Sequence, residues 1–278
     1  MKTAKKLSAI FMVIVIIACS ASVMASAKKL NYLLLGDSIA FGQGILNSGE
    51  ACYGRIVANS NGYGYDNDAI SGMSSAAFLT QLSSGNIDAD IKKADIISIS
   101  IGGNDYLTRN WVLMGLKGMF FNNYADFDEV MNGFANNFSS IIGKIRSLNP
   151  KATILMQTVY NPHSDNLAEM FQQGVDRLNK VIRDYLKAHS GAYIIADVGS
   201  VISGHSEYIA IDTIHPNGAG NIAIATYLLK LLKGLGLGSA STPVISVEPV
   251  DTVGFGADYF TRLYSFILRF AARVAEVF

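Results

Sequence analysis

Short apolar runs alternate with longer amphipathic stretches along most of this chain. Runs with strand character lie at 31–35, 65–70, 95–101, 152–159 and 192–198. The last three are almost continuously apolar and rich in β-branched residues, a pattern typical of parallel strands buried on both faces. We therefore expect a largely parallel sheet that is covered on each side.

Apolar residues at helical spacing occupy the stretches between the later strands. The clearest helices are predicted over 127–148, 167–188 and 217–233. Asn149-Pro150 ends the first, and Gly234 follows the third. Because strand and helix alternate, the fold class is α/β, and the arrangement predicts a three-layer α/β/α sandwich with about five strands. In such sheets, ligands bind at the carboxyl ends of the strands.

The N-terminal segment has the pattern of an export signal. Basic residues precede an apolar run from Leu7 to Ala18, and Ala25-Ser26-Ala27 fits an A-x-A cleavage site. The run is shorter than the roughly 20 residues of a bilayer span. We interpret 1–27 as a signal peptide of an exported, bacterial extracellular or cell-envelope protein. The alternatives are an uncleaved anchor and a loose lipobox that would lipidate Cys19.

The chain after the third predicted helix changes in composition. We assign 28–237 to one domain and 238–256, rich in Gly, Ser, Pro and Val, to a flexible linker. Residues 257–278 then predict an amphipathic helix with a Phe-rich face and three arginines on the other side. This helix either covers its own domain or makes peripheral contact with a membrane or cell-envelope partner.

Composition limits the functional classes. The formal net charge is zero, with 50% hydrophobic and 16% charged residues. Basic residues do not cluster beyond the N-terminus, so nothing indicates nucleic-acid binding. Neither HExxH nor CxxC occurs, and we expect no metal and no cofactor. Cleavage after Ala27 would leave Cys52 alone, which predicts a protein without an internal disulfide.

The turn after the first strand, Gly36-Asp37-Ser38, allows three interpretations: a phosphate cradle, a displayed nucleophile or an ordinary turn. The P-loop and dinucleotide patterns both fail, since Gln43 stands where a P-loop needs Lys and Asn47 where a dinucleotide fingerprint needs Gly. A nucleophilic Ser needs a base and a group that orients it. Half of a G-x-S-x-G elbow is present as well.

His215 is the histidine best suited to be that base. It lies three residues after Asp212 and directly before a predicted helix, although Asp and Asn could merely cap that helix. Two other turns follow strands: Ser71-Gly72-Met73 and Gly102-Gly103-Asn104-Asp105. A parallel sheet would bring all these turns to one edge, which favours a catalytic site.

These residues resemble the four blocks of the SGNH, or GDSL-type, hydrolase superfamily over about 30–235. Gly36-Asp37-Ser38 matches the nucleophile block, Gly72 the glycine block, Gly102 to Asp105 the G-x-N-D block and Asp212 to His215 the D-x-x-H block. Ile39 replaces the Leu of the family's name without touching the chemistry. The resemblance implies a flavodoxin-like sheet and separates the chain from the elbow of α/β-hydrolases, because Ser38 follows the first strand.

By that resemblance, Ser38 is the nucleophile, His215 the general base and Asp212 the acid that orients it. The oxyanion hole would use the N–H groups of Ser38 and Gly72 and the amide of Asn104. The expected function is an exported serine esterase or lipase acting on a small-molecule, lipid or acylated-carbohydrate ester. The alternatives are an O-acetyl carbohydrate deacetylase and a non-catalytic envelope binding module.

An apolar stretch, 106–124, directly follows Asn104 and Asp105. It holds large side chains that suit either ordinary core packing or an adaptable apolar site. We expect five of them to line the acyl pocket or form a lid: Trp111, Met114, Leu116, Met119 and Phe120.

Overall fold

The computed structural model describes residues 29–164 and 168–252. The predicted signal peptide, Cys19 and the predicted helix 257–278 lie outside these ranges. Within them, five parallel strands form one sheet in the order β2-β1-β3-β4-β5. The strands are β1 (Asn31–Gly36), β2 (Gly64–Asn67), β3 (Ile96–Ser100), β4 (Thr153–Gln157) and β5 (Ile194–Ala196). The predicted parallel sheet and its strand number are confirmed.

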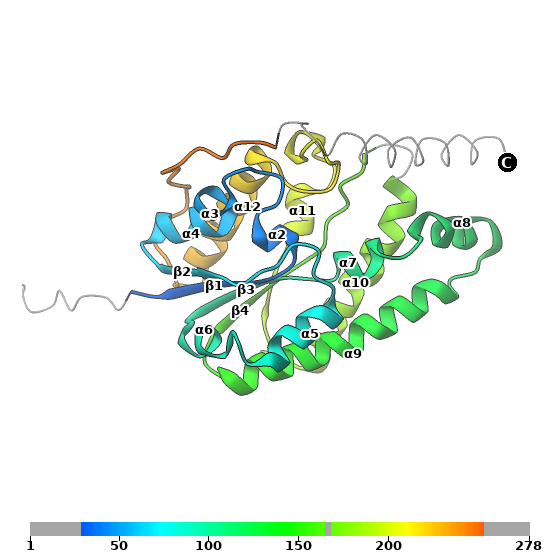
Figure 1. The fold of residues 1–278 in the computed structure, drawn as a ribbon, viewed down its shortest axis with the longest axis horizontal. Coiled ribbons are helices and arrows are strands. Elements are labelled where there is room, and N and C mark those ends of the chain that lie inside the picture. Colours follow the sequence, from blue (N-terminus) through cyan, green and yellow to red (C-terminus); the bar gives the residue numbers. More distant parts are fainter. Residues whose placement is uncertain (1–28, 165–167, 253–278) are drawn as a thin grey trace, which may run out of the picture.

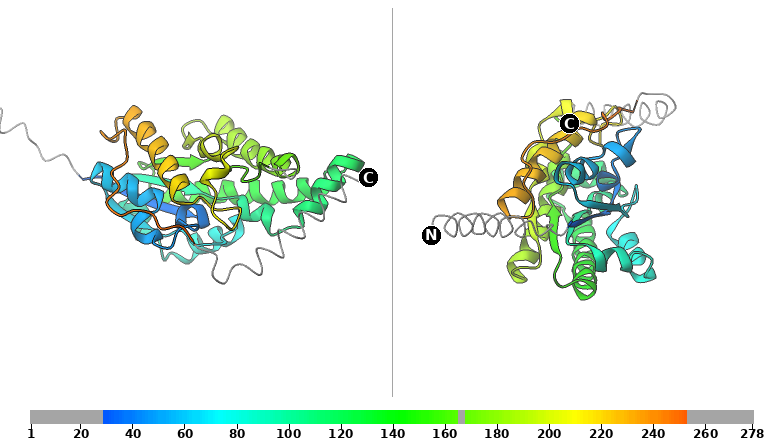
Figure 2. Two further views of the ribbon diagram at one scale, coloured as in Figure 1. Left: turned by 90° about the horizontal axis from the view of Figure 1, so that it is seen from above. Right: turned by 90° about the vertical axis from the view of Figure 1, so that its left-hand side faces the viewer.

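Helices cover both faces of this sheet (Figures 1 and 2). One face carries α5 (Ser75–Ser84), α6 (Asp88–Lys93), α7 (Gly103–Leu107), α8 (Trp111–Phe121), α9 (Ala125–Leu148) and α10 (Ala168–Ala188). The other carries α2 (Ser38–Phe41), α3 (Ser48–Ala51), α4 (Tyr53–Asn61), α11 (Val198–Ile202) and α12 (Gly218–Gly234). The three-layer α/β/α sandwich is therefore confirmed.

Alternation along β1 explains why both faces are buried. Leu33 and Leu35 pack into the cluster under α5, α9 and α10, whereas Tyr32 and Leu34 pack into the cluster under α4 and α12. All four side chains are at most 2% exposed. Successive strand side chains point to opposite faces, so a continuous apolar run fills two cores at once.

The strand order places a site at one particular edge. From β1, the chain adds β2 on one side and then crosses to add β3 on the other. The connections that leave the carboxyl ends of β1 and β3 therefore run in opposite directions, which makes this edge the topological switch point where doubly wound sheets bind ligands. Ser38 follows β1, and Asn104 follows β3.

The described part of the predicted linker differs from the expected flexible segment. Residues 238–252, which we call the C-terminal strap, run back across the domain beside α12 and α3 (Figure 1, orange to red). The N–H groups of Ser239 and Val244 donate to the side chains of Asn61 and Ser60 over 3.1 and 2.8 Å. Composition predicted mobility here, but polar side chains of the domain satisfy the backbone of the strap.

Among the described helices, none has the length and apolar character needed to cross a membrane.

Candidate active site

The turn at Gly36-Asp37-Ser38 is built on a close approach between β1 and β3. Gly36 has a φ of +111°, and a Cβ at this position would lie 1.9 Å from the carbonyl oxygen of Ser100. Only glycine fits such a contact. The next N–H, that of Asp37, donates to the same carbonyl over 2.8 Å. The Asp37 carboxylate then caps α2 through the N–H of Ile39 at 3.1 Å, which fixes Ser38 as the first residue of the helix.

The structure brings together the predicted Ser, His and Asp. Nε2 of His215 lies 2.9 Å from Oγ of Ser38, and Nδ1 of His215 lies 2.7 Å from Oδ2 of Asp212. The side chain of His215 is 12% exposed and that of Asp212 is 25% exposed. The imidazole therefore bridges the hydroxyl and the carboxylate, as a base with an orienting acid requires.

The loop that carries His215 is held at several backbone points. The N–H of Ala210 donates to the carbonyl of His215 over 2.7 Å, and the Tyr160 hydroxyl donates to the carbonyl of Ile214 over 2.6 Å. Thr213 turns the chain with a φ of +65°, a conformation that β-branched residues rarely adopt. Such strain persists where the surroundings impose it, which is typical of functional loops.

Hydrogen bonds settle the charge state of Asp212. Burial acts to raise the pKa of this carboxyl, but the imidazole and two backbone N–H groups, those of Ile214 and His215, together hold the pKa below its usual value. A carboxylate that stays ionised stabilises a proton on the neighbouring imidazole. Asp37 differs, because burial raises its pKa to about 6 despite hydrogen bonds from Ser100 and Ile39.

The turns that bear Gly72 and Asn104 are tied to each other. The side-chain amide of Asn104 donates to the carbonyl of Met73 over 3.0 Å, and its second N–H remains available because an amide has two donors. The Asp105 carboxylate accepts the N–H of Ser75 over 2.8 Å. Gly72 has a φ of +77° and open space around it. Asn104 borders the pocket beside Ser38, whereas Gly72 lies in the adjoining exposed turn.

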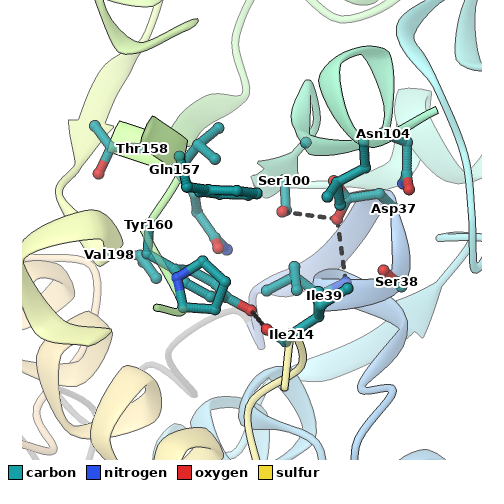
Figure 3. A pocket seen from close by; sticks show the side chains of 15 residues that line it. Asp37, Ser38, Ile39, Ser100, Asn104, Gln157, Thr158, Tyr160, Val198 and Ile214 are labelled. Carbon is teal, nitrogen blue, oxygen red and sulfur yellow. Dashed lines mark hydrogen bonds between the residues drawn. The ribbon is translucent and has the colours of Figure 1, made fainter. Parts of the chain in front are cut away.

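The pocket beside Ser38 opens between the ends of β1, β3 and β4 (Figure 3). Its volume is about 50 Å³. Its walls are mainly apolar and include Ile39, Leu107, Val159, Tyr160, Pro162, Phe171, Val198 and Ile214. Gln157 is the most buried polar wall residue, 2% exposed, and its amide donates to the Tyr53 hydroxyl over 2.7 Å and to Ser98 over 3.0 Å.

The five predicted acyl-pocket residues do not line this pocket. Trp111 and Met114, 3% and 4% exposed, fill the core beneath α8, and Leu116 packs against that core. Met119 and Phe120 are 45% and 46% exposed on the helix surface. The expectation of a pocket wall was therefore wrong, and ordinary core packing accounts for the buried members.

Two glycines allow α8 to pack closely on its neighbours. A Cβ at Gly115 would lie 2.0 Å from Met170 of α10, and one at Gly118 would lie 2.6 Å from Tyr124. The helix therefore turns its large buried side chains into the core rather than toward Ser38. Sequence reasoning missed the true wall. Residues 157–160 could have been found, since they follow β4 at the same sheet edge, but Phe171 lies on α10 and gave no such signal.

Within 29–164 and 168–252, no cluster of three His, Cys, Asp or Glu residues has the arrangement of a metal site.

Comparison with known proteins gives a consistent family. The model of the GDSL-like Lipase/Acylhydrolase family matches residues 34–223. "Uncharacterized protein YpmR" of Bacillus subtilis (strain 168) is 30% identical over 62% of this chain and 67% of its own length. The spore germination lipase LipC of Bacillus licheniformis is 27% identical over 58% and 74%.

A solved structure shows the same fold. The crystal structure of the lipase Lip_vut3 from a goat rumen metagenome aligns with a TM-score of 0.60 at 24% identity. The alignment covers 76% of this chain and 99% of that chain. The match supports the three-layer α/β/α sandwich described above.

Proposed function

The chain belongs to the GDSL-like lipase/acylhydrolase family of ester hydrolases, and we propose that it cleaves carboxylic esters by a serine mechanism through an acyl-enzyme. The observation that carries the proposal is the chain of contacts from Ser38 Oγ to His215 Nε2 at 2.9 Å and from His215 Nδ1 to Asp212 at 2.7 Å. Ser, His and Asp in this relation recur in unrelated serine hydrolases.

Each residue has a defined step in this mechanism. Ser38 Oγ attacks the ester carbonyl while Nε2 of His215 accepts the hydroxyl proton. Asp212 stabilises the resulting imidazolium, and His215 then protonates the leaving alcohol. Water then attacks the acyl-enzyme while His215 accepts a proton from it. His215 returns this proton to Oγ of Ser38 as the carboxylic acid product leaves.

The oxyanion of the tetrahedral intermediate needs fixed donors. We assign this role to the N–H groups of Ser38 and Gly72 and to the free N–H of the Asn104 amide. Asn104 already borders the pocket. The hydrogen bond from the Asn104 amide to the carbonyl of Met73 holds the Gly72 turn beside Asn104 before the reaction begins, so these donors need not reorganise as the oxyanion forms.

We further propose that the acyl group is short. The pocket beside Ser38 has a volume of about 50 Å³, and this small space suits an acetyl or similarly small group. This observation also favours the second candidate, a deacetylase of O-acetylated carbohydrate, over a long-chain lipase.

Two measurements test these proposals. A fluorophosphonate should label the wild type at Ser38 but not Ser38→Ala, which separates an enzyme from a non-catalytic binding module. Rates on p-nitrophenyl esters from acetate to palmitate, beside acetylated xylan and a lysophospholipid, should peak at the short acyl groups. A peak at palmitate would contradict the short-acyl proposal and leave the serine mechanism standing.

We also propose export, with 1–27 as the signal peptide and Cys19 as an alternative lipidation site. N-terminal sequencing of the protein from its producing cell separates these cases. A new N-terminus at Lys28 supports the signal peptide, and a lipidated Cys19 supports the lipoprotein.

A further inference from the structure

The last residues of the C-terminal strap return to the catalytic edge of the sheet. The N–H of Leu46 donates to the carbonyl of Val250 over 2.7 Å, and the N–H of Thr252 donates to the carbonyl of Gly44 over 3.1 Å. Between them, Ile45 and Asp251 form an antiparallel bridge. The strap thus adds a short paired segment to the loop that follows α2, although residues after 223 lie beyond the family match.

Asn47 reinforces this pairing with its side chain. Its amide N–H donates to the carbonyl of Glu248 and its amide oxygen accepts the N–H of Val250, both over 2.9 Å. The Asn47 side chain therefore both donates to the strap backbone and accepts a hydrogen bond from it. The pairing is anchored at a defined register rather than by loose surface contact.

The loop paired with the strap lies directly against the catalytic histidine. Gly44 has a φ of +109°, and a Cβ there would lie 2.3 Å from the carbonyl oxygen of Pro216 and 3.1 Å from Cβ of His215. Hence the backbone at Gly44 supports the His215 loop without an intervening side chain. A displacement of Gly44 would be transmitted to the imidazole.

Asp251 holds the same loop from its other end. Its Oδ1 accepts the N–H of Gly218 over 2.6 Å. Gly218 is the first residue of α12 and lies three residues after His215. A carboxylate at this position also complements the positive end of a 17-residue helix. Asn217 caps the helix through Gly220, so Asp251 satisfies a different N–H.

We propose that Asp251 is a positioning residue for His215. Through the Gly218 N–H and the strap pairing with residues 44–47, it fixes the His215 loop on both sides at the distance that Ser38 requires. The inference rests on the serine mechanism proposed above. Its physical reason is that a misplacement of about 1 Å at a reacting group can lower the rate by about 10²-fold.

The test uses full-length variants. Asp251→Ala removes the hydrogen bond, and Asp251→Asn retains an oxygen acceptor without the charge. Glu248→Gln is the matched control, because it removes an exposed carboxylate from the same strap. Glu248 contacts Asn47 through its backbone carbonyl, which this substitution leaves in place. Asn47→Ala weakens the strap pairing from the other partner. For each variant we would measure kcat, KM and the rate of fluorophosphonate labelling.

Asp251→Ala should lower kcat and the labelling rate about tenfold, within the range that misplacement allows, with KM unchanged within about twofold. Asp251→Asn should restore most of kcat, Asn47→Ala should act in the same direction as Asp251→Ala, and Glu248→Gln should match the wild type.

The proposal predicts slower catalysis in Asp251→Ala and Asn47→Ala. The contrary result is that both variants fold and melt earlier, yet keep the wild-type kcat and labelling rate. That outcome would make the strap merely structural and overturn the inference. His215→Ala measured in parallel separates the two proposals. If His215→Ala remains fully active, the serine mechanism itself fails; if it is inactive while Asp251→Ala is normal, only the role of Asp251 fails.

Discussion

The hydroxyl of Ser100 donates a hydrogen bond over 2.8 Å to the carboxylate of Asp37, directly before the proposed nucleophile in the chain. Asp37 is 3% exposed. The pair joins the ends of β1 and β3 at the switch point (Figure 3). Its buried carboxyl also makes the stability of the fold depend on pH.

Burial raises the pKa of Asp37 to about 6, above the ordinary aspartate value of about 3.9. The folded state therefore holds this proton more tightly than the unfolded state. The resulting stabilisation is present below about pH 4 and is lost as pH rises through about 6. Asp37→Asn removes this titrating group. Between about pH 4 and pH 6, the free energy of unfolding of the wild type should therefore fall by about 2–3 kcal/mol more than that of Asp37→Asn.

Urea unfolding of wild type and Asp37→Asn from pH 4 to pH 8 measures this difference. Asp68, whose pKa burial also raises to about 6, is present in both proteins and cancels. Parallel curves for the two proteins would show that Asp37 does not titrate in this window.

Kinetics should separate the proposed nucleophile, Ser38, from one proposed oxyanion donor, Asn104. Ser38→Ala and His215→Ala should each lower kcat by about 10⁴–10⁶. Asn104→Ala should lower it less, by about 10²–10³, because other donors remain. Asn104→Asp should be at least as poor, since an ionised carboxylate cannot donate. Hydrolysis at the wild-type rate in folded Ser38→Ala would remove Ser38 from the mechanism.

Glycine positions offer a matched stability test. Gly36→Ala would place a Cβ 1.9 Å from the Ser100 carbonyl oxygen at a residue with positive φ. We expect this variant to lose about 3 kcal/mol or more of its free energy of unfolding. Gly143 lies on an exposed face of α9, and a Cβ there would meet nothing within 4 Å, so Gly143→Ala should stabilise by about 0.5–1 kcal/mol. Thermal and urea unfolding of both variants measure the two effects, which should differ in sign.

Substitutions can test whether the pocket beside Ser38, rather than the surface of α8, receives the acyl group. Leu107 lines the pocket, so Leu107→Ala should enlarge it and move the preferred p-nitrophenyl ester toward longer acyl groups. Phe120→Ala, on the exposed surface of α8, should leave the profile unchanged. Trp111→Ala should instead reduce stability by about 3–5 kcal/mol as a buried aromatic. A profile altered by Phe120→Ala and not by Leu107→Ala would reverse this assignment.

Periodicity predicted the elements that bury a long, regular face. The helices over 125–148, 168–188 and 218–234 carry buried residues at almost every third or fourth position, and all three agree with the sequence expectation within a few residues. The short α4 and α5 were not singled out. In α5, Phe78 and Leu82 are the buried apolar residues, too few to show a period.

Ser38 and Asn104 could be predicted because each comes just after a strand, and parallel strands end at one edge. Asp212 and His215 lie beyond α11 in the loop before α12, and their spacing of three residues made them predictable. The pocket wall could not be predicted, because Phe171 reaches it from a helix through packing that only the folded chain defines. The prediction of a flexible linker over the strap differed from the structure for a related reason. Its Gly, Ser and Pro content predicts mobility, whereas its order comes from distant partners such as Asn47 and Asn61.

The position of the strap changes how the C-terminal segment should be tested. The sequence of 257–278 predicts an amphipathic helix whose arginines and Phe-rich face suit an anionic lipid surface. A chain cut at Gly238 would also lose the strap and its hydrogen bonds to Gly44 and Gly218, so a loss of binding could not be separated from damage to the fold. A chain ending at Thr252 keeps those contacts.

We expect the full-length chain to sediment with anionic liposomes at low salt and the chain ending at Thr252 to remain in the supernatant with unchanged melting temperature. Binding should weaken as salt rises, because arginine attraction to lipid head groups is screened beyond a Debye length of about 10 Å at 0.1 M. A full-length chain that stays in the supernatant excludes the lipid contact. If the shortened chain melts much earlier instead, residues after Thr252 stabilise the domain, and the helix belongs to the fold rather than to a membrane surface.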